Sequence, residues 1–196
     1  KVCPGERQRK RAGKCRLSVQ VSVFPTLVPN SHVLANVNGV FNAIHVRGDM
    51  VGDTLYYGRG AGQDATASAV LSDLADAALD LKTGCKNRVA PFVPHECEGA
   101  VTPMDEVVSR YYVRLNVVDR PGTLARIATI LGRAGIGISS VIQPEGHEGE
   151  SVPLILMIHD ATNRAMRSAL AKIGRLPVIK GAPVMFRVES FDETES

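Results

Sequence analysis

Residues 110–135 read RYYVRLNVVDRPGTLARIATILGRAG, and this stretch decides the fold of the second half of the chain. Apolar and polar side chains alternate over 111–117, which is typical of a strand with one buried face. Residues 119–122 form a turn sequence, and apolar side chains then recur at helical spacing over 124–131. Gly135 stands where a glycine commonly ends a helix. The stretch therefore predicts a strand, a tight turn and a helix.

The segments that follow complete a recognisable order of elements. Strands are expected at 136–143, 153–159 and 184–188, and a helix is expected at 162–173. The order is β-α-β-β-α-β, the ferredoxin-like arrangement, in which two helices cover one face of a four-stranded antiparallel sheet. Because the other face has no predicted cover, we expect a homo-oligomer formed through sheet pairing.

The first part of the chain predicts a smaller set of elements. Residues 17–23 alternate as a strand, and strands at 40–46 and 54–57 are expected to pair antiparallel across a turn-rich connection. A glycine-rich loop at 58–62 then leads into a helix over 66–81, whose apolar side chains share one face. These elements predict a partial mixed-sheet domain.

The glycine-rich loop has two interpretations. Gly58, Gly60 and Gly62 are spaced GxGxG ahead of a helix, with Asp64 as the expected N-cap. Glycines let a backbone approach phosphate closely, and a helix start attracts anions. The spacing is not the dinucleotide fingerprint GxGxxG, so from the residues alone a plain tight turn is the favoured explanation of the loop.

Composition shifts predict the domain boundaries of an α+β chain. We expect a partial domain at 1–81, a linker rich in glycine and proline at 82–108, a ferredoxin-like domain at 109–189 and an acidic tail at 190–196. Basic side chains crowd the first sixteen residues, but no aromatic side chains or recognition helix accompany them. Nucleic-acid binding is therefore not favoured over a solvated arm.

The bulk composition favours an ordinary globular protein. Of the 196 residues, 44% are hydrophobic and 22% are charged, and the formal net charge is +3. No apolar run approaches the roughly 18 residues that cross a bilayer, and no signal peptide is evident, so we expect a cytoplasmic chain without a membrane partner. The four cysteines lack the paired spacing of a zinc site, and no metal site is predicted.

Two groups of motifs resemble a known family. The stretches LANVNGVFNAI (34–44), YGRGAG (57–62) and TASAV (66–70) resemble the later part of the catalytic domain of homoserine dehydrogenases. The stretch at 110–125 and GISSVIQ (137–143) resemble the ACT regulatory domain that follows it in many bacterial members. The chain thus resembles the C-terminal portion of that family, with a ferredoxin-like βαββαβ ACT domain.

The resemblance implies NAD- or NADP-dependent interconversion of L-homoserine and L-aspartate 4-semialdehyde, in threonine and methionine biosynthesis. It places Gly60 against the nicotinamide nucleotide, with Gly58 and Gly62 on either side. The family's GxGxxG segment, its proton-transferring lysine and its homoserine-binding carboxylates have no counterpart among these residues. No catalytic residue is therefore assigned, and we expect the chain alone to bind cofactor weakly or not at all and to be catalytically incomplete.

The turn between the strand at 111–117 and the next helix is the candidate effector site. Asp119 and Gly122 lie where a helix N-terminus could hold an α-carboxylate, and Gln143 could add a polar contact across the sheet end. Helix capping in a tight turn explains Asp119 and Gly122 equally well from the sequence. The resemblance favours an amino-acid effector, L-threonine, and the alternative is a stand-alone amino-acid-binding regulatory module.

Overall fold

The computed structural model describes residues 17–84, 99–144, 149 and 151–191. The chain divides into two compact units. Unit 1 combines Lys1–Val28 with Cys97–Ser196, and unit 2 is Pro29–Glu96. The basic arm, the four cysteines and most of the acidic tail lie outside the described residues.

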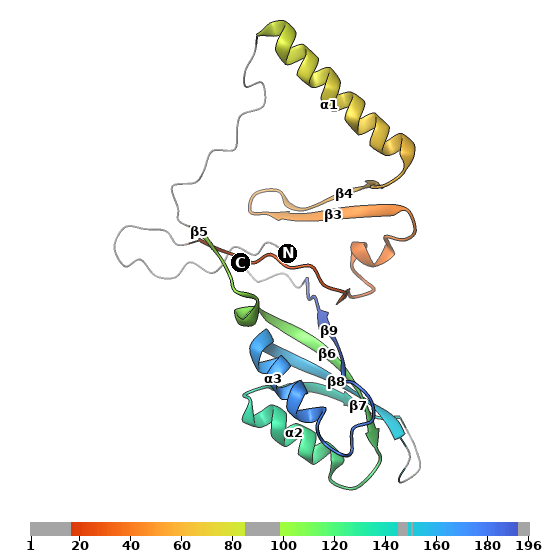
Figure 1. The fold of residues 1–196 in the computed structure, drawn as a ribbon, viewed down its shortest axis with the longest axis vertical. Helices are drawn as coiled ribbons and strands as arrows, with labels where there is room; N and C mark the ends of the chain where they lie inside the picture. The colour runs from red at the N-terminus through yellow and green to blue at the C-terminus, as the bar shows by residue number, and fades with distance from the viewer. Residues whose placement is uncertain (1–16, 85–98, 145–148, 150, 192–196) are drawn as a thin grey trace, which may run out of the picture. The chain divides into compact units, whose positions relative to one another are not determined.

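Unit 1 is built on a five-stranded sheet with the strand order β2-β9-β6-β8-β7. The two helices α2 and α3 pack side by side over one face of it (Figure 1). The strands are β2 (Thr26–Leu27), β6 (Val108–Val118), β7 (Ile138–Ile142), β8 (Ser151–Thr162) and β9 (Val184–Val188), and the helices are α2 (Thr123–Arg133) and α3 (Asn163–Ile173). Strands β9, β6, β8 and β7 pair antiparallel, so the predicted ferredoxin-like βαββαβ fold is confirmed.

The ends of both helices follow from local sequence. Helix α2 begins after Gly122 and is followed by Gly135, and both glycines have left-handed backbone conformations with φ of 84° and 70°. Helix α3 begins after Thr162, whose hydroxyl accepts a hydrogen bond from the Ala165 N–H at 3.3 Å. These positions agree with the turn and capping signals in the sequence to within a residue or two.

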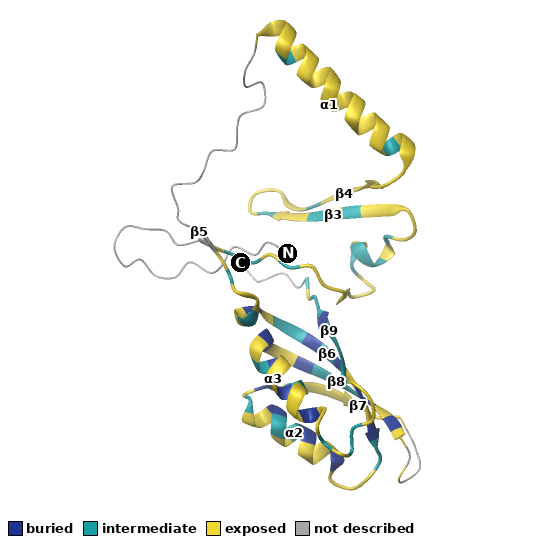
Figure 2. Cartoon of the chain, viewed as in Figure 1, coloured by how far each residue is buried: buried dark blue, intermediate teal, exposed yellow. Residues whose placement is uncertain are grey.

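The core of unit 1 lies between the sheet and its two helices. Alternate residues of β6 and β8 are buried, as the period-two pattern requires, and Figure 2 shows the buried positions concentrated there. The largest fully buried side chains include Leu115, Leu154 and Ile158 from the strands and Ile127 and Leu131 from α2. One contiguous apolar cluster therefore stabilises this unit.

The segment before unit 2 also belongs to unit 1, which differs from the boundaries expected at 81 and 108. Strand β1 (Leu17–Val19) pairs parallel with β5 (Gly99–Val101), and Thr26 of β2 pairs parallel with Arg187 of β9. The expected linker thus contains β5 and the 3₁₀ turn η2 (Met104–Glu106). Pairing between residues so distant in sequence has no local signal.

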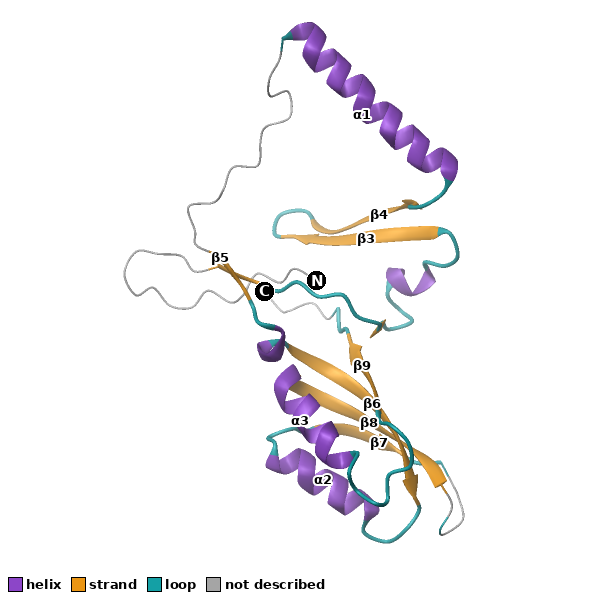
Figure 3. Ribbon diagram, in the orientation of Figure 1, coloured by secondary structure: helices purple, strands orange, loops and turns teal. Residues whose placement is uncertain are grey.

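Unit 2 contains a hairpin and a long helix (Figure 3). A 3₁₀ turn η1 (Val33–Asn36) precedes β3 (Phe41–Gly48), β4 (Gly52–Arg59) and α1 (Gln63–Thr83). The strands pair antiparallel, as predicted, with Phe41 opposite Arg59. The expected N-cap was wrong: Gly62, with a φ of 135°, is the N-cap of α1, and Asp64 lies inside the first turn, because the helix begins earlier than its apolar periodicity suggests.

Unit 2 has no buried residue among those the structure describes. The apolar face predicted for α1 is open to solvent, and Val70, Leu74 and Leu81 are 52%, 60% and 85% exposed. Exposed apolar side chains on one helix face indicate an interaction surface. Among the described helices, none has the length and apolarity needed to cross a membrane.

The hairpin of unit 2 carries a charged cross-strand pair. Arg47 on β3 and Asp53 on β4 form two hydrogen bonds, Nε to Oδ1 at 2.6 Å and Nη2 to Oδ2 at 2.8 Å. His45 Nε2 lies 3.6 Å from Asp53 Oδ1. The hydrogen bonds from Arg47 hold the pKa of Asp53 below its ordinary value.

We expect Arg47→Gln to raise the pKa of Asp53 back toward that of an unperturbed aspartate, because the hydrogen bonds from Arg47 are lost. Since the folded pKa is lowered, the pair stabilises the hairpin above the unfolded pKa and loses this effect as the pH falls through the folded one. Carboxyl ¹³C NMR titration measures the midpoint directly. Arg59→Gln, at the other end of the hairpin, is the control. An unchanged Asp53 midpoint in Arg47→Gln would contradict the assignment.

Candidate functional site

The structure brings two of the three candidate effector residues together. Strands β6 and β7 are both antiparallel to β8, so they end at the same edge of the sheet. Asp119 follows β6 and Gln143 follows β7, and Gln143 Nε2 donates a hydrogen bond to Asp119 Oδ1 at 3.1 Å. A carboxylate and an amide thus meet beside the turn that leads into α2.

Asp119 does not cap α2 with its side chain. The N-cap is Gly122, and no side chain forms a capping hydrogen bond there. The turn is held instead by Thr123, whose hydroxyl donates to the Val118 carbonyl at 3.1 Å, and by the Gly149 N–H, which donates to the Asp119 carbonyl at 2.9 Å. The Asp119 carboxylate is therefore not required for the helix start.

Gly122 has a structural reason to be glycine. Its φ of 84° lies in the left-handed region, which side chains disfavour, while the space around its Cβ position is open. The backbone conformation alone explains the residue type.

A basic hollow lies against the same turn. It has a volume of about 290 Å³, and Arg120, Arg126 and Lys180 line it together with Thr123. Guanidinium and ammonium groups around one hollow favour a carboxylate or phosphate group. The sequence did not single out these cations, because Lys180 joins the other two only through the connection between α3 and β9.

The glycine-rich loop connects β4 to α1. A Cβ at Gly60 would collide with the side-chain amide of Asn42, whereas the Cβ positions of Gly58 and Gly62 meet nothing within 4 Å. The contact with Asn42 gives Gly60 a packing role inside unit 2. Gly62 has a φ of 135° and begins the helix.

A hollow lies beside the glycine-rich loop, at the start of α1. The hollow next to it is lined by uncharged side chains along the first turns of α1, including Thr66, Val70 and Leu71. Asp64 in the first turn opposes an anion at this helix start. The loop thus does not fit a complete NAD or NADP site, and no chemical step follows from it.

Comparison with known proteins matches the two halves of the chain to two different family models. The family model for homoserine dehydrogenase matches residues 5–75, and the ACT domain model matches residues 111–177. Homoserine dehydrogenase from Pseudomonas aeruginosa is 41% identical over 177 residues, which are 88% of this chain and 41% of that protein. The enzyme from Neisseria gonorrhoeae is 37% identical over 187 residues, 94% of this chain and 42% of that protein.

A solved structure shows the same arrangement of elements. The homoserine dehydrogenase from Thiobacillus denitrificans superposes with a TM-score of 0.74 at 35% identity, over 96% of this chain and 41% of that one. The chain therefore spans about two fifths of the length of these relatives. On the strength of both family matches and this structural likeness, the chain belongs to the homoserine dehydrogenase family and carries an ACT domain.

Proposed function

We propose that the chain serves as the C-terminal, ACT-bearing part of a homoserine dehydrogenase. The reaction of that enzyme interconverts L-homoserine and L-aspartate 4-semialdehyde with NAD or NADP, in threonine and methionine biosynthesis in the cytoplasm. The two family matches in chain order support this assignment. Hydride transfer needs cofactor and substrate held together in near-attack geometry. Since Gly58, Gly60 and Gly62 are the only residues of this chain that the family resemblance places beside the cofactor, we propose that this chain alone does not turn over substrate.

The regulatory part of the proposal is that the ACT unit binds an amino acid, L-threonine. The observation that carries it is the contact between Asp119 and Gln143 at 3.1 Å, next to a helix start that needs neither side chain as a cap. In this arrangement Asp119 attracts the ligand ammonium group, and the first turn of α2 attracts its carboxylate. Gln143 orients Asp119 and adds a polar contact. Together they suit a zwitterion.

A thermal-shift titration of the purified chain with L-threonine tests the proposal. A ligand at about 100 times its Kd adds roughly 2.7 kcal/mol to the unit that binds it, which raises Tm by roughly 10 °C for a unit of this size. L-Homoserine and NADPH serve as parallel ligands. No saturable shift with threonine would remove Asp119, Gly122 and Gln143 from the effector assignment.

We expect Gly122→Val to abolish the threonine shift, because the added side chain projects into the open space at the start of α2, where we propose that the ligand carboxylate binds. The variant also strains a left-handed position, at a cost of about 1–2 kcal/mol. Gly135→Val is the matched control, since Gly135 has the same left-handed backbone and an equally open Cβ position at the other end of α2. If Gly122→Val keeps the shift, the turn is only structural.

A homo-oligomer through the ACT sheet is the remaining part of the proposal. Strand β7 is the last strand of the sheet, and its Val141 and Ile142 are 41% and 55% exposed. An edge strand with free backbone groups and apolar side chains pairs readily with a second copy. The sheet face away from the helices adds Tyr112 and Phe186, whose rings lie 6.3 Å apart.

A further inference from the structure

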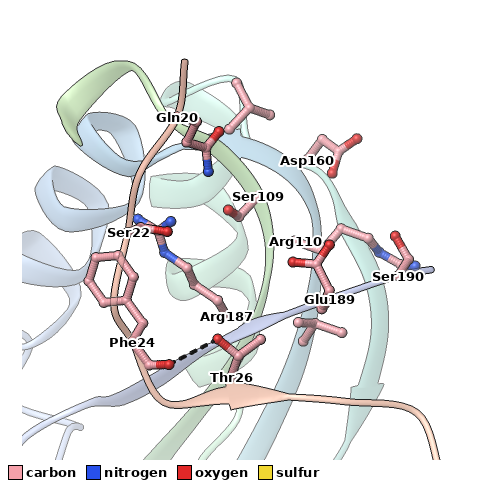
Figure 4. A pocket seen from close by; sticks show the side chains of 12 residues that line it. Gln20, Ser22, Phe24, Thr26, Ser109, Arg110, Asp160, Arg187, Glu189 and Ser190 are labelled. Atoms are coloured by element: carbon pink, nitrogen blue, oxygen red, sulfur yellow. Dashed lines mark hydrogen bonds between the residues drawn. The ribbon is translucent and has the colours of Figure 1, made fainter. Parts of the chain in front are cut away.

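Unit 1 contains a second polar cavity, far from the turn at Asp119. It lies where residues 20–26 cross the start of β6 and the end of β9, and its volume is about 430 Å³ (Figure 4). We propose that this cavity binds a small oxyanion, the carboxylate or phosphate group of a metabolite, and that Arg187 is its principal ligand.

The first step in the argument is the burial of Arg187. This residue of β9 is 8% exposed, and it pairs across the sheet with Tyr111, which is 0% exposed. Its side chain therefore lies on the same buried side of the sheet as Tyr111, at the end where residues 20–26 cover it. Arginine is rarely buried without a partner of opposite charge.

The partners of the guanidinium do not neutralise it. Among the described residues its recorded hydrogen bond is from Nη2 to the Met104 sulfur at 3.4 Å, and a thioether is a weak acceptor. The guanidinium carbon lies 3.9 Å from the centre of the Phe24 ring, so a cation–π contact covers one face of the group. A guanidinium has five in-plane N–H donors, and stacking leaves these donors free for other acceptors.

Among the described residues, the neighbouring ionisable groups form no ion pair with Arg187. The Tyr111 hydroxyl is buried and has no hydrogen-bond partner in the part of the chain that the structure describes. Burial raises the pKa of the Tyr111 phenol, so this group is neutral at neutral pH. Asp160 and Glu189 line the other side of the cavity, across from the Arg187 guanidinium (Figure 4).

The rest of the lining suits a polar ligand. Figure 4 shows the Arg187 guanidinium beside Ser22 and Phe24, while Ser109 also projects into the cavity. Gln20 adds a side-chain amide. The planar guanidinium fork matches a carboxylate or phosphate bidentately, and hydroxyl groups can donate to the remaining oxygen atoms. A volume of about 430 Å³ holds a small metabolite in addition to its anionic group.

The cavity is independent of the proposed threonine site. Arg187 pairs with residues at the start of β6, whereas Asp119 follows the end of the same strand. The competing explanation is that Arg187 only fastens Phe24, and with it residues 20–26, to the sheet. A purely structural arginine would show no saturable response to anions, which separates the two explanations.

The test is an NMR titration of the ¹⁵N-labelled full chain at constant ionic strength, observing the Arg187 Nε–Hε signal and the backbone amide signals of Ser22 and Ser109, which line the cavity and can also be followed in Arg187→Lys. Inorganic phosphate and acetate are added in separate arms. We expect a saturable chemical-shift change with at least one of the two anions. Binding should be at least tenfold weaker in Arg187→Lys, which keeps the positive charge but loses the planar guanidinium donors. Arg114→Lys is the control, because Arg114 is exposed on the same sheet.

Saturation with phosphate alone or acetate alone supports the site and identifies the group that it prefers. A linear, non-saturating shift in both arms, or equal binding by Arg187→Lys, overturns it. The wild-type signal remains informative if the variant fails to fold. Gly122→Val should leave the anion response unchanged, so failure of the threonine proposal and failure of this one are distinguishable.

Discussion

Replacing Leu115 by Ala will lower the free energy of unfolding of the ACT unit by about 2–5 kcal/mol. Leu115 lies in the middle of β6, is 0% exposed, and faces Leu154 of β8, which is also 0% exposed. The truncation removes apolar contacts and leaves a cavity that a packed sheet cannot close. Because domains of this size are stable by only about 5–15 kcal/mol, the loss is a large share of the total.

Urea titration followed by far-ultraviolet circular dichroism measures this change, as a lower midpoint at unchanged slope. Leu124→Ala is the matched control, since Leu124 on α2 is 40% exposed and its truncation should cost less than about 1 kcal/mol. Equal losses from the two substitutions would show that the cluster around Leu115 is not the stabilising core.

The second large effect is expected in solution association. The apolar face of α1, defined by Val70, Leu74 and Leu81, is exposed, so we expect the chain to self-associate and to bind hydrophobic dyes. Burying a leucine contributes at least about 1.5 kcal/mol. Leu74→Gln with Leu81→Gln should therefore weaken association by roughly 100-fold.

Sedimentation velocity over a range of concentrations gives the association constant. Leu79→Gln is the control, because Leu79 is 48% exposed on the opposite side of α1. If a dimer persists in the Leu74→Gln, Leu81→Gln variant, its interface is assigned to the sheet of the ACT unit. A monomer at every concentration before any substitution would rule out both surfaces as self-association sites.

Local patterns predicted the ferredoxin-like unit well, because its signals lie close together in the chain. Alternation over 111–117 appears as the buried and exposed residues of β6, and Gly122 and Gly135 occupy the left-handed positions that their places around α2 require. Strands β6 and β7 are both antiparallel to β8, so their C-terminal ends lie at the same end of the sheet. This topology brings Asp119 and Gln143 together. Short-range physics was sufficient for these features.

The features that sequence reasoning missed depend on distant contacts. Nothing in residues 17–28 indicates pairing with β5 and β9, because a strand does not identify its partner. In the sequence Arg187 is an ordinary strand residue, and its burial cannot be predicted because it depends on the distant Phe24, whose ring covers the guanidinium. Gly60 resembled a nucleotide-approach glycine, and its contact with Asn42 became visible only when β3 and the loop were placed together.

The discontinuous composition of unit 1 has a consequence for how the chain is made. Thr26 leaves the ribosome before its sheet partner Arg187, which follows only after all of unit 2 and most of the ACT sequence. Strands that pair over such separations form late, since loop closure must precede the contact. During synthesis, therefore, β2 is made well before β9, its partner in the sheet, while the hairpin of unit 2 can already form from neighbouring residues. A premature stop anywhere before β9 would release a nascent product with that early edge uncovered, which is the kind of species that chaperones and proteases recognise.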